Sequence, residues 1–263
     1  MKIYHYTTIE TLALIIKSRA IRFNRLDCVD DLEESLYGSG NMNIKLSQYE
    51  FVSCWTKDKE ENLALWKMYT NNKGVRICMD DDFLITYDVM PKFKSFLSSA
   101  IQMGDDYVVS SFMNEAKLFD VIYTNEYIDK INSLISQKGE MISIDTRHLG
   151  LYKSERWKFQ NESRFKIIVM PKNNNYVNVP NQASDFDILF NMMSSLAPSM
   201  ASQSPIKIKH IDIGIKEEKL NEIEVMMGPE TTEAERYIVE MLLSKFENSS
   251  IKDSYFKGKI KSK

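Results

Sequence analysis

The sequence predicts an α+β fold in which residues 1–250 form a single domain and residues 251–263 form a basic flexible tail. Short stretches in which apolar and polar residues alternate are separated by segments with helical periodicity. The 263 residues are 43% hydrophobic and 27% charged, which is typical of a globular protein and excludes intrinsic disorder. We find no internal repeat and no segment with the composition of a linker, so we expect one domain.

The N-terminal segment predicts a strand followed directly by a helix. Residues 2–6 are aromatic and alternating, which is typical of a strand. Thr7 and Glu10 match a capping box, so a helix is expected from Thr7 to about Lys17. His5 and Thr7 would then lie where a strand end meets a helix N-terminus, whose free N–H groups and positive dipole end suit an anionic ligand.

The remaining elements are predicted from the same patterns. Further strands are expected at residues 20–24, 51–56, 74–79, 162–170, 206–215 and 222–227. Helices are expected at residues 60–69, 149–158 and 233–246. The middle of the chain, 91–135, is expected to form helices around one strand at 118–123. Residues 26–34 predict an acidic loop, 173–175 a turn, and the Ser- and Met-rich stretch 191–205 a mobile loop or a broken helix.

Charge and hydropathy limit the classes of protein that fit the sequence. The 34 basic and 37 acidic side chains give a net charge of −3, so bulk charge does not point to nucleic acid, although a local groove could still bind it. No stretch approaches about 18 consecutive apolar residues, so we expect no membrane-spanning segment. The N-terminus lacks the apolar core of a secretion signal, so no such signal is expected.

Cysteines and histidines are few and lack the spacing of a metal site. They are Cys28, Cys54, Cys78, His5, His148 and His210. An odd number of cysteines without short paired spacing argues against a disulfide framework and a zinc site, and for a reducing compartment. We therefore expect a cytoplasmic protein with no bound metal.

Three segments combine chemically useful residues, at positions 4–7, 51–55 and 153–165. Together with their surroundings they read Y-H-Y-T, F-N-R-L-D, F-V-S-C-W-T, L-W-K-M-Y, G-V-R-I, K-(x)3-W-(x)4-E-x-R and M-G-P-E. This pattern resembles a large bacterial family that is catalogued as a domain of unknown function and is often found beside phage-defence genes. The resemblance covers most of the chain and is most specific over residues 3–34, 51–80 and 153–169. The acidic turn of that family usually reads N-D-P, whereas this chain has Asp30-Asp31-Leu32.

The order of a His strand, a Ser strand and a Glu strand is also similar to the ADP-ribosyltransferase fold. This resemblance implies two small sheets around a cleft, with helices packed outside. His5 and Thr7 would match the H-x-T of histidine-type members, and Ser53 the first Ser of F-x-S-T-S. Cys54 and Trp55 replace the other two residues of that second motif. Gln160-Asn161-Glu162 would match the Q-x-E of the arginine-type branch.

The chemistry of NAD cleavage gives these residues roles. Breaking the bond between nicotinamide and ribose develops positive charge on the sugar, which a carboxylate on a rigid strand stabilises. We expect Glu162 and His5 to be catalytic, and Gln160 and Arg164 to face the acceptor substrate. Aromatic side chains would stack on nicotinamide, and Arg25, Lys153 or the helix start would bind the diphosphate. The residues expected to bind NAD are Tyr6, Thr7, Arg25, Ser53, Trp55, Trp66 and Tyr69.

The sequence therefore favours an NAD-dependent ADP-ribosyltransferase that modifies a macromolecular acceptor, either nucleic acid or protein. It would act as the toxin or effector of an anti-phage or toxin–antitoxin system, with an antitoxin protein as a candidate partner. One alternative is a non-enzymatic sensor or interaction protein of a defence system. Another is a metal-dependent nuclease that uses Asp27, Asp30, Asp31 and Glu34. Glu162 and Arg164, two residues apart on one strand face, could also form a structural ion pair.

Overall fold

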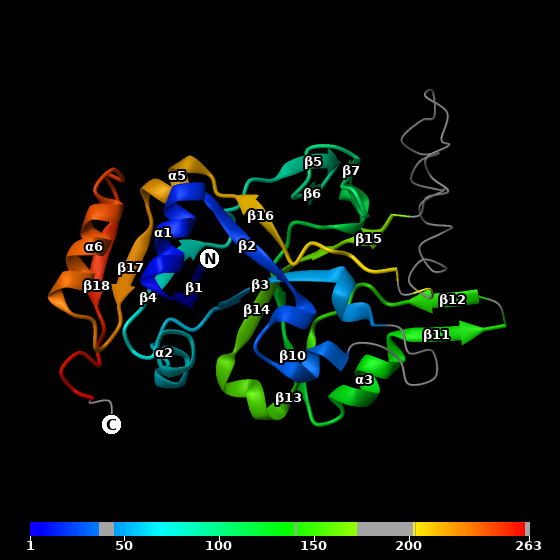
Figure 1. The fold of residues 1–263 in the computed structure, drawn as a ribbon, viewed down its shortest axis with the longest axis horizontal. Helices are drawn as coiled ribbons and strands as arrows, with labels where there is room; N and C mark the ends of the chain where they lie inside the picture. The colour runs from blue at the N-terminus through cyan, green and yellow to red at the C-terminus, as the bar shows by residue number, and fades with distance from the viewer. Residues whose placement is uncertain (37–44, 140, 173–201, 203, 261–263) are drawn as a thin grey trace.

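The central feature of the computed structural model is a sheet of nine strands from the N-terminal, middle and C-terminal parts of the chain (Figure 1). The structure describes residues 1–36, 45–139, 141–172, 202 and 204–260. Within these residues the strand order is β16-β2-β3-β1-β4-β17-β18, and β14 pairs with β3 and β9 with β14. The bounds are β1 Lys2–Thr7, β2 Ala20–Arg25, β3 Glu50–Thr56, β4 Val75–Asp80, β9 Phe119–Asp120, β14 Glu162–Ile168, β16 His210–Gly214, β17 Glu224–Met227 and β18 Ser250–Asp253.

The sheet separates into two parts between β1 and β3. Strand β3 pairs along its whole length with β14, and its first half pairs with the end of β2. Strand β1 pairs along its whole length with β4, but in the described part of the chain it meets β3 only where Tyr4 pairs with Thr56. The predicted α+β class is confirmed. The two predicted sheets are instead two parts of one hydrogen-bonded sheet that diverge beyond this pair.

The α-helices in the described residues are α1 Ile9–Ser18, α2 Leu63–Thr70, α3 Tyr127–Ser133, α5 Glu217–Asn221 and α6 Glu233–Leu243. Three of these five helices, α1, α2 and α6, begin at side-chain caps. Helix α1 is capped by Thr8, whose hydroxyl accepts from the Thr11 N–H at 3.2 Å, so the cap lies one residue after the predicted Thr7. Helix α2 begins three residues later than predicted because the Asn62 side chain accepts from the N–H groups of Ala64 and Leu65.

The middle of the chain differs most from the prediction. Residues 91–135 form mainly short strands, a 3-10 helix at Ser111–Met113 and α3, rather than helices around one strand. Residues 149–158 contain β13 and the start of a 3-10 helix, Glu155–Gln160, instead of an α-helix. Strands of two to four residues are too short to show alternation, so their pattern resembles that of a loop or a helix. These strands are β5 Tyr87–Met90, β6 Phe93–Ser95, β7 Ile101–Met103, β8 Tyr107–Ser110, β10 Ile122–Thr124, β11 Ile135–Lys138, β12 Met141–Ile144, β13 Tyr152–Ser154 and β15 Met170–Pro171.

The acidic segment and the chain end are more ordered than predicted. Residues 26–34 form most of two 3-10 helices, Leu26–Cys28 and Leu32–Leu36. The predicted tail begins with β18, which pairs in parallel with β17 beside α6 at one end of the molecule (Figure 1). The predictions for 173–175 and for most of 191–205 lie outside the described residues. No helix in the described part of the chain is long and apolar enough to cross a membrane.

Strand β14 is buried on both faces, and its two faces differ in chemistry. Phe165 and Ile167 belong to the hydrophobic core, where Phe165 lies against Phe83 with ring centroids 5.8 Å apart. Arg164 and Lys166, on the opposite face, are equally buried. One face of this strand therefore packs in the hydrophobic core, and the other face carries buried charged side chains.

Candidate functional site

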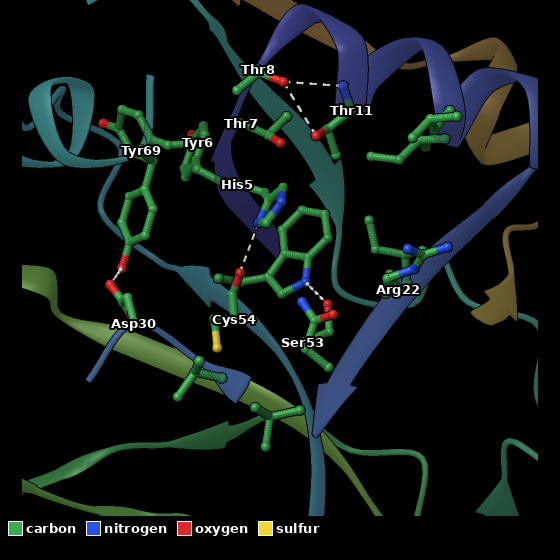
Figure 2. Close-up of a pocket in the computed structure, with 18 of the residues that line it drawn as sticks. His5, Tyr6, Thr7, Thr8, Thr11, Arg22, Asp30, Ser53, Cys54 and Tyr69 are labelled. Carbon is green, nitrogen blue, oxygen red and sulfur yellow. Dashed lines mark hydrogen bonds between the residues drawn. The ribbon is translucent and has the colours of Figure 1, made fainter. Parts of the chain in front are cut away.

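A cavity of about 830 Å³ lies where the two parts of the sheet diverge. Residues of α1, α2, β1, β2, β3 and the segment after β2 form its walls (Figure 2). Cavities of roughly 300–1,000 Å³ typically hold small-molecule ligands. Eight side chains predicted for the site line it: His5, Tyr6, Thr7, Ser53, Trp55, Tyr69, Gln160 and Glu162.

Three predicted site residues do not line the cavity. Arg25 pairs with Asp27, with 2.6 Å between Nε and Oδ1, and donates to the carbonyl of Ile206. Trp66 is fully buried against the ring of Tyr6, with centroids 4.9 Å apart. Arg164 is buried in an ion-pair cluster below the cavity wall. Contrary to the prediction, Arg25 and Trp66 therefore have no free surface for NAD in this cavity, and Arg164 has none for an acceptor.

The cavity is lined by both faces of the sheet. Residues paired across antiparallel strands share a face. Glu162 pairs with Thr56, and Ser163 pairs with Trp55, so Glu162 and Trp55 lie on opposite faces. His5 lies on the Trp55 side, with the two ring centroids 5.1 Å apart. We call these the His5 face (His5, Thr7, Ser53, Trp55) and the Glu162 face (Tyr4, Tyr6, Cys54, Glu162).

On the His5 face, hydrogen bonds within the protein hold polar side chains in place, and these side chains can still bond to a ligand. Nδ1 of His5 donates to the carbonyl of Cys54 at 2.8 Å. Burial lowers the pKa of His5, although this hydrogen bond opposes the shift. The neutral ring therefore presents Nε2 as an acceptor. Nε1 of Trp55 donates to Oγ of Ser53 at 3.0 Å, which leaves the Ser53 hydroxyl proton to donate elsewhere.

On the Glu162 face, charges are paired with one another. The Glu162 carboxylate forms ion pairs with Arg164, whose Nε lies at 2.6 Å, and with Lys153, whose Nζ lies at 3.2 Å. Glu34 closes the cluster by binding Arg164 through two contacts of 2.6 Å and Lys153 through one of 3.0 Å. All four side chains are at most 7% exposed. Glu162 and Arg164 thus form the buried ion pair that the sequence left as an alternative.

This cluster sets the protonation state of Glu162. Burial raises the pKa of the carboxyl, but the charges of Arg164 and Lys153 outweigh burial and lower the pKa to about 2. The Cys54 thiol lies beside it, and burial together with the Glu162 charge raises the pKa of this thiol well above its usual range. Glu162 is therefore an anion at neutral pH, and Cys54 is a neutral thiol.

A chain of hydrogen bonds crosses one end of the cavity. The Tyr69 hydroxyl donates to Oδ2 of Asp30 at 3.0 Å and accepts from Nε2 of Gln160 at 2.9 Å. Burial and the Asp30 charge raise the pKa of Tyr69. Oε1 of Gln160 is buried and has no hydrogen-bond partner among the described residues. This end of the cavity therefore offers acceptors and negative charge.

Several cavity residues were missed by sequence reasoning. They are Tyr4, Thr8, Thr11, Lys17, Arg22 and Asp212, among others. Arg22 is an exposed position of a short strand, and its partner Asp212 is 190 residues away, so no local signal connects them. Glu34 was assigned only to a metal site, although it is buried and neutralises Arg164.

The acidic residues proposed for a nuclease do not form one cluster. Asp27 binds Arg25, Asp30 binds Tyr69, and Glu34 binds Arg164. Among the described residues, no three side chains of His, Cys, Asp or Glu are placed to hold one metal ion. The geometry of this segment therefore gives no support to a metal-dependent nuclease.

Comparisons with protein-family models, with curated proteins and with solved structures found no match to this chain. The geometry and charges of the cavity are therefore the basis for a functional assignment.

Proposed function

We propose that this protein is an NAD-dependent ADP-ribosyltransferase that modifies a macromolecular acceptor, as the effector of an anti-phage or toxin–antitoxin system. The supporting observation is that His5, Ser53 and Glu162, from three strands far apart in the sequence, line one cavity. The divergence of the sheet beside Tyr4 and Thr56 supports the ADP-ribosyltransferase-like arrangement of two sheets around a cleft. A cytoplasmic location is part of the proposal, and the odd number of cysteines supports it.

The proposed reaction breaks one bond and forms one. The bond between C1′ of the ribose and the nicotinamide nitrogen breaks, and its electron pair leaves with nicotinamide. The Glu162 carboxylate stabilises the positive charge that develops on the ribose. A nucleophile of the acceptor then bonds to C1′ and loses its proton to water. On the other face, Nε2 of His5 and the hydroxyl of Ser53 offer an acceptor and a donor that would orient the dinucleotide.

Labelled NAD tests this proposal directly. The parent protein is incubated with cell extract and NAD labelled in its ADP-ribose part, and label transfer and nicotinamide release are measured. We expect both activities in the parent and a loss of about 100-fold or more in Glu162→Gln, as for removal of one charge-stabilising group. The control is Glu224→Gln, since Glu224 is a partly exposed carboxylate that pairs with Lys252 and does not line the cavity.

Because Glu162→Gln disturbs the charge cluster, a second variant is needed. Ser53→Ala leaves the cluster intact and should weaken NAD binding. A parent protein without label transfer or nicotinamide release would refute the proposal, as would a folded Glu162→Gln variant with parental activity.

One observation favours the sensor as a second candidate. Both carboxylate oxygens of Glu162 already bind cations, Arg164 and Lys153, so a sugar hydroxyl must share the carboxylate with them. A sensor that binds NAD without cleaving it needs no free carboxylate. Calorimetric NAD binding without nicotinamide release would identify the sensor.

A further inference from the structure

Basic and hydroxyl side chains gather at the end of the cavity between α1 and β2. Lys17 and Ser18 lie in the last turn of α1, and β2 begins two residues later at Ala20. Lys17, Ser18 and Arg22 of β2 all line the cavity. The Tyr69–Asp30 pair lies on the opposite side of His5 from Arg22 (Figure 2). The two ends of the cavity are therefore chemically different: cations outnumber carboxylates at the Arg22 end, whereas the Tyr69 end carries the Asp30 carboxylate and hydrogen-bond acceptors.

Arg22 is fixed in a geometry that leaves donors available. Nε donates to Oδ1 of Asp212 at 3.0 Å, and a second guanidinium nitrogen donates to Oδ2 at 3.2 Å. A guanidinium carries five N–H groups, so the pair with Asp212 leaves the remaining ones for another anion. The planar two-point contact holds the guanidinium in one orientation without a loss of these donors.

Lys17 adds a second cation that no described residue neutralises. Among the described residues, no carboxylate forms an ion pair with Lys17, whereas Arg22 pairs with Asp212. Two cations thus face one carboxylate at this end. The opposite end carries the Asp30 carboxylate, which would repel a phosphate. An anionic part of a ligand is therefore favoured between α1 and β2.

We infer that Lys17 and Arg22 form a phosphate-binding subsite that takes the diphosphate of a dinucleotide. The identification of that dinucleotide as NAD rests on the proposed function, whereas the charge distribution requires only a ligand that carries phosphate. The sequence favoured Arg25 and Lys153 for this role. Arg25 is instead paired with Asp27, and Lys153 is paired with Glu34 and Glu162. Arg22 and Lys17 replace them as the cations that reach the cavity.

Calorimetry with phosphate-bearing and phosphate-free probes tests the subsite. ADP-ribose, inorganic diphosphate and adenosine are titrated into the parent, Arg22→Gln and Lys17→Gln. The matched control is Arg19→Gln, because Arg19 is as exposed as Arg22, 51% against 50%, and pairs with Glu217 outside the cavity.

We expect Arg22→Gln to weaken ADP-ribose and diphosphate binding by about tenfold or more, as for loss of a charge-assisted hydrogen bond. Lys17→Gln should weaken both by a smaller factor, and Arg19→Gln should bind like the parent. Adenosine should bind equally to all four proteins. Parental ADP-ribose affinity in Arg22→Gln, a parent that binds neither ADP-ribose nor diphosphate, or an equal loss in Arg19→Gln would each overturn the subsite.

Nicotinamide release separates this inference from the proposed function. If the parent cleaves NAD and Arg22→Gln cleaves it equally well at low NAD concentration, the subsite is wrong and the enzymatic proposal stands. If ADP-ribose binding depends on Arg22 but the parent releases no nicotinamide, the subsite is right and the enzymatic proposal is wrong. Nicotinamide riboside serves as the phosphate-free substrate, whose cleavage should not depend on Arg22.

Discussion

The two faces of the sheet that meet at the cavity differ in how their polar groups are used. On the His5 face, His5 and Ser53 each make one fixed hydrogen bond and keep further hydrogen-bonding capacity. On the Glu162 face, the charged side chains are occupied by one another. We infer that the His5 face mainly recognises ligand, whereas the Glu162 face contributes both to the stability of the fold and to its chemistry.

The difference follows from burial. Transferring charges out of water costs free energy that only close pairing offsets, so a buried charge cluster must be complete. Glu162, Arg164, Lys153 and Glu34 satisfy this condition with two charges of each sign. The groups of the His5 face are neutral, so each of them can change with a smaller effect on the free energy of unfolding.

The largest expected effect is the loss of Arg164. Arg164→Met leaves Glu34 and Glu162 buried with only Lys153 between them, so the free energy of unfolding should fall by about 3–5 kcal/mol. Urea unfolding measures this change. The control is Arg22→Met, which breaks a half-exposed pair with Asp212 and should cost about 1 kcal/mol or less. Equal stability of Arg164→Met and the parent would show that the cluster is dispensable.

A second prediction concerns the acid limb of stability. The pKa of Glu162 is lowered from 4.5 to about 2 in the folded protein. This group therefore stabilises the fold above pH 4.5, and its contribution of about 3 kcal/mol is lost as the pH falls toward 2. Unfolding measured between pH 2 and 5 should show this loss in the parent, and Glu162→Gln should lack it. The same acid dependence in both proteins would contradict the pairing.

Glu50 should have the opposite pH dependence to Glu162, although both residues lie on the same face of the sheet. Burial raises its pKa to about 7, while Lys166, 3.1 Å away, only partly opposes the shift. The folded state therefore resists ionisation of Glu50, and about 3 kcal/mol of stability is lost as the pH rises from 4.5 to 7. Urea unfolding over this range measures the loss, which should shrink in Glu50→Gln. A flat profile in the parent would contradict the raised pKa.

The smallest expected effect on stability comes from the His5 face. His5→Ala removes one hydrogen bond to the Cys54 carbonyl, so the free energy of unfolding should fall by about 1 kcal/mol. NAD affinity should fall by about tenfold, because an oriented acceptor is lost. Calorimetry and urea unfolding on one sample give both numbers. A stability loss as large as that of Arg164→Met would remove the distinction between the faces.

The parts of the fold that the sequence predicted are those with long, regular patterns. Strands β1, β2, β3 and β14 are six or seven residues long, and they carry most of the candidate site. The short strands between residues 87 and 154 have no measurable period. Capping was predicted one residue early because the spacing of Thr7 and Glu10 matches a capping box, whereas Thr8 caps the helix in the structure.

The candidate site was predicted where chemistry coincided with such a strand, as for His5, Ser53 and Glu162. It was missed where partners are distant in the chain. Arg164 and Glu34 are 130 residues apart, and the pattern around Glu34 is that of a solvated acidic loop. Pairing of this kind depends on tertiary structure, so no spacing in the sequence reveals it.

The three histidines allow the most direct test of ligand binding at the diverging sheet. Only His5 lines the cavity, whereas His148 pairs with Asp145 at an exposed site. Proton and nitrogen resonances of the imidazoles are recorded by NMR while NAD is added. We predict that the His5 signals shift to saturation while those of His148 stay fixed. His5 signals that remain unchanged at saturating NAD would contradict the assignment of this cavity as the NAD site.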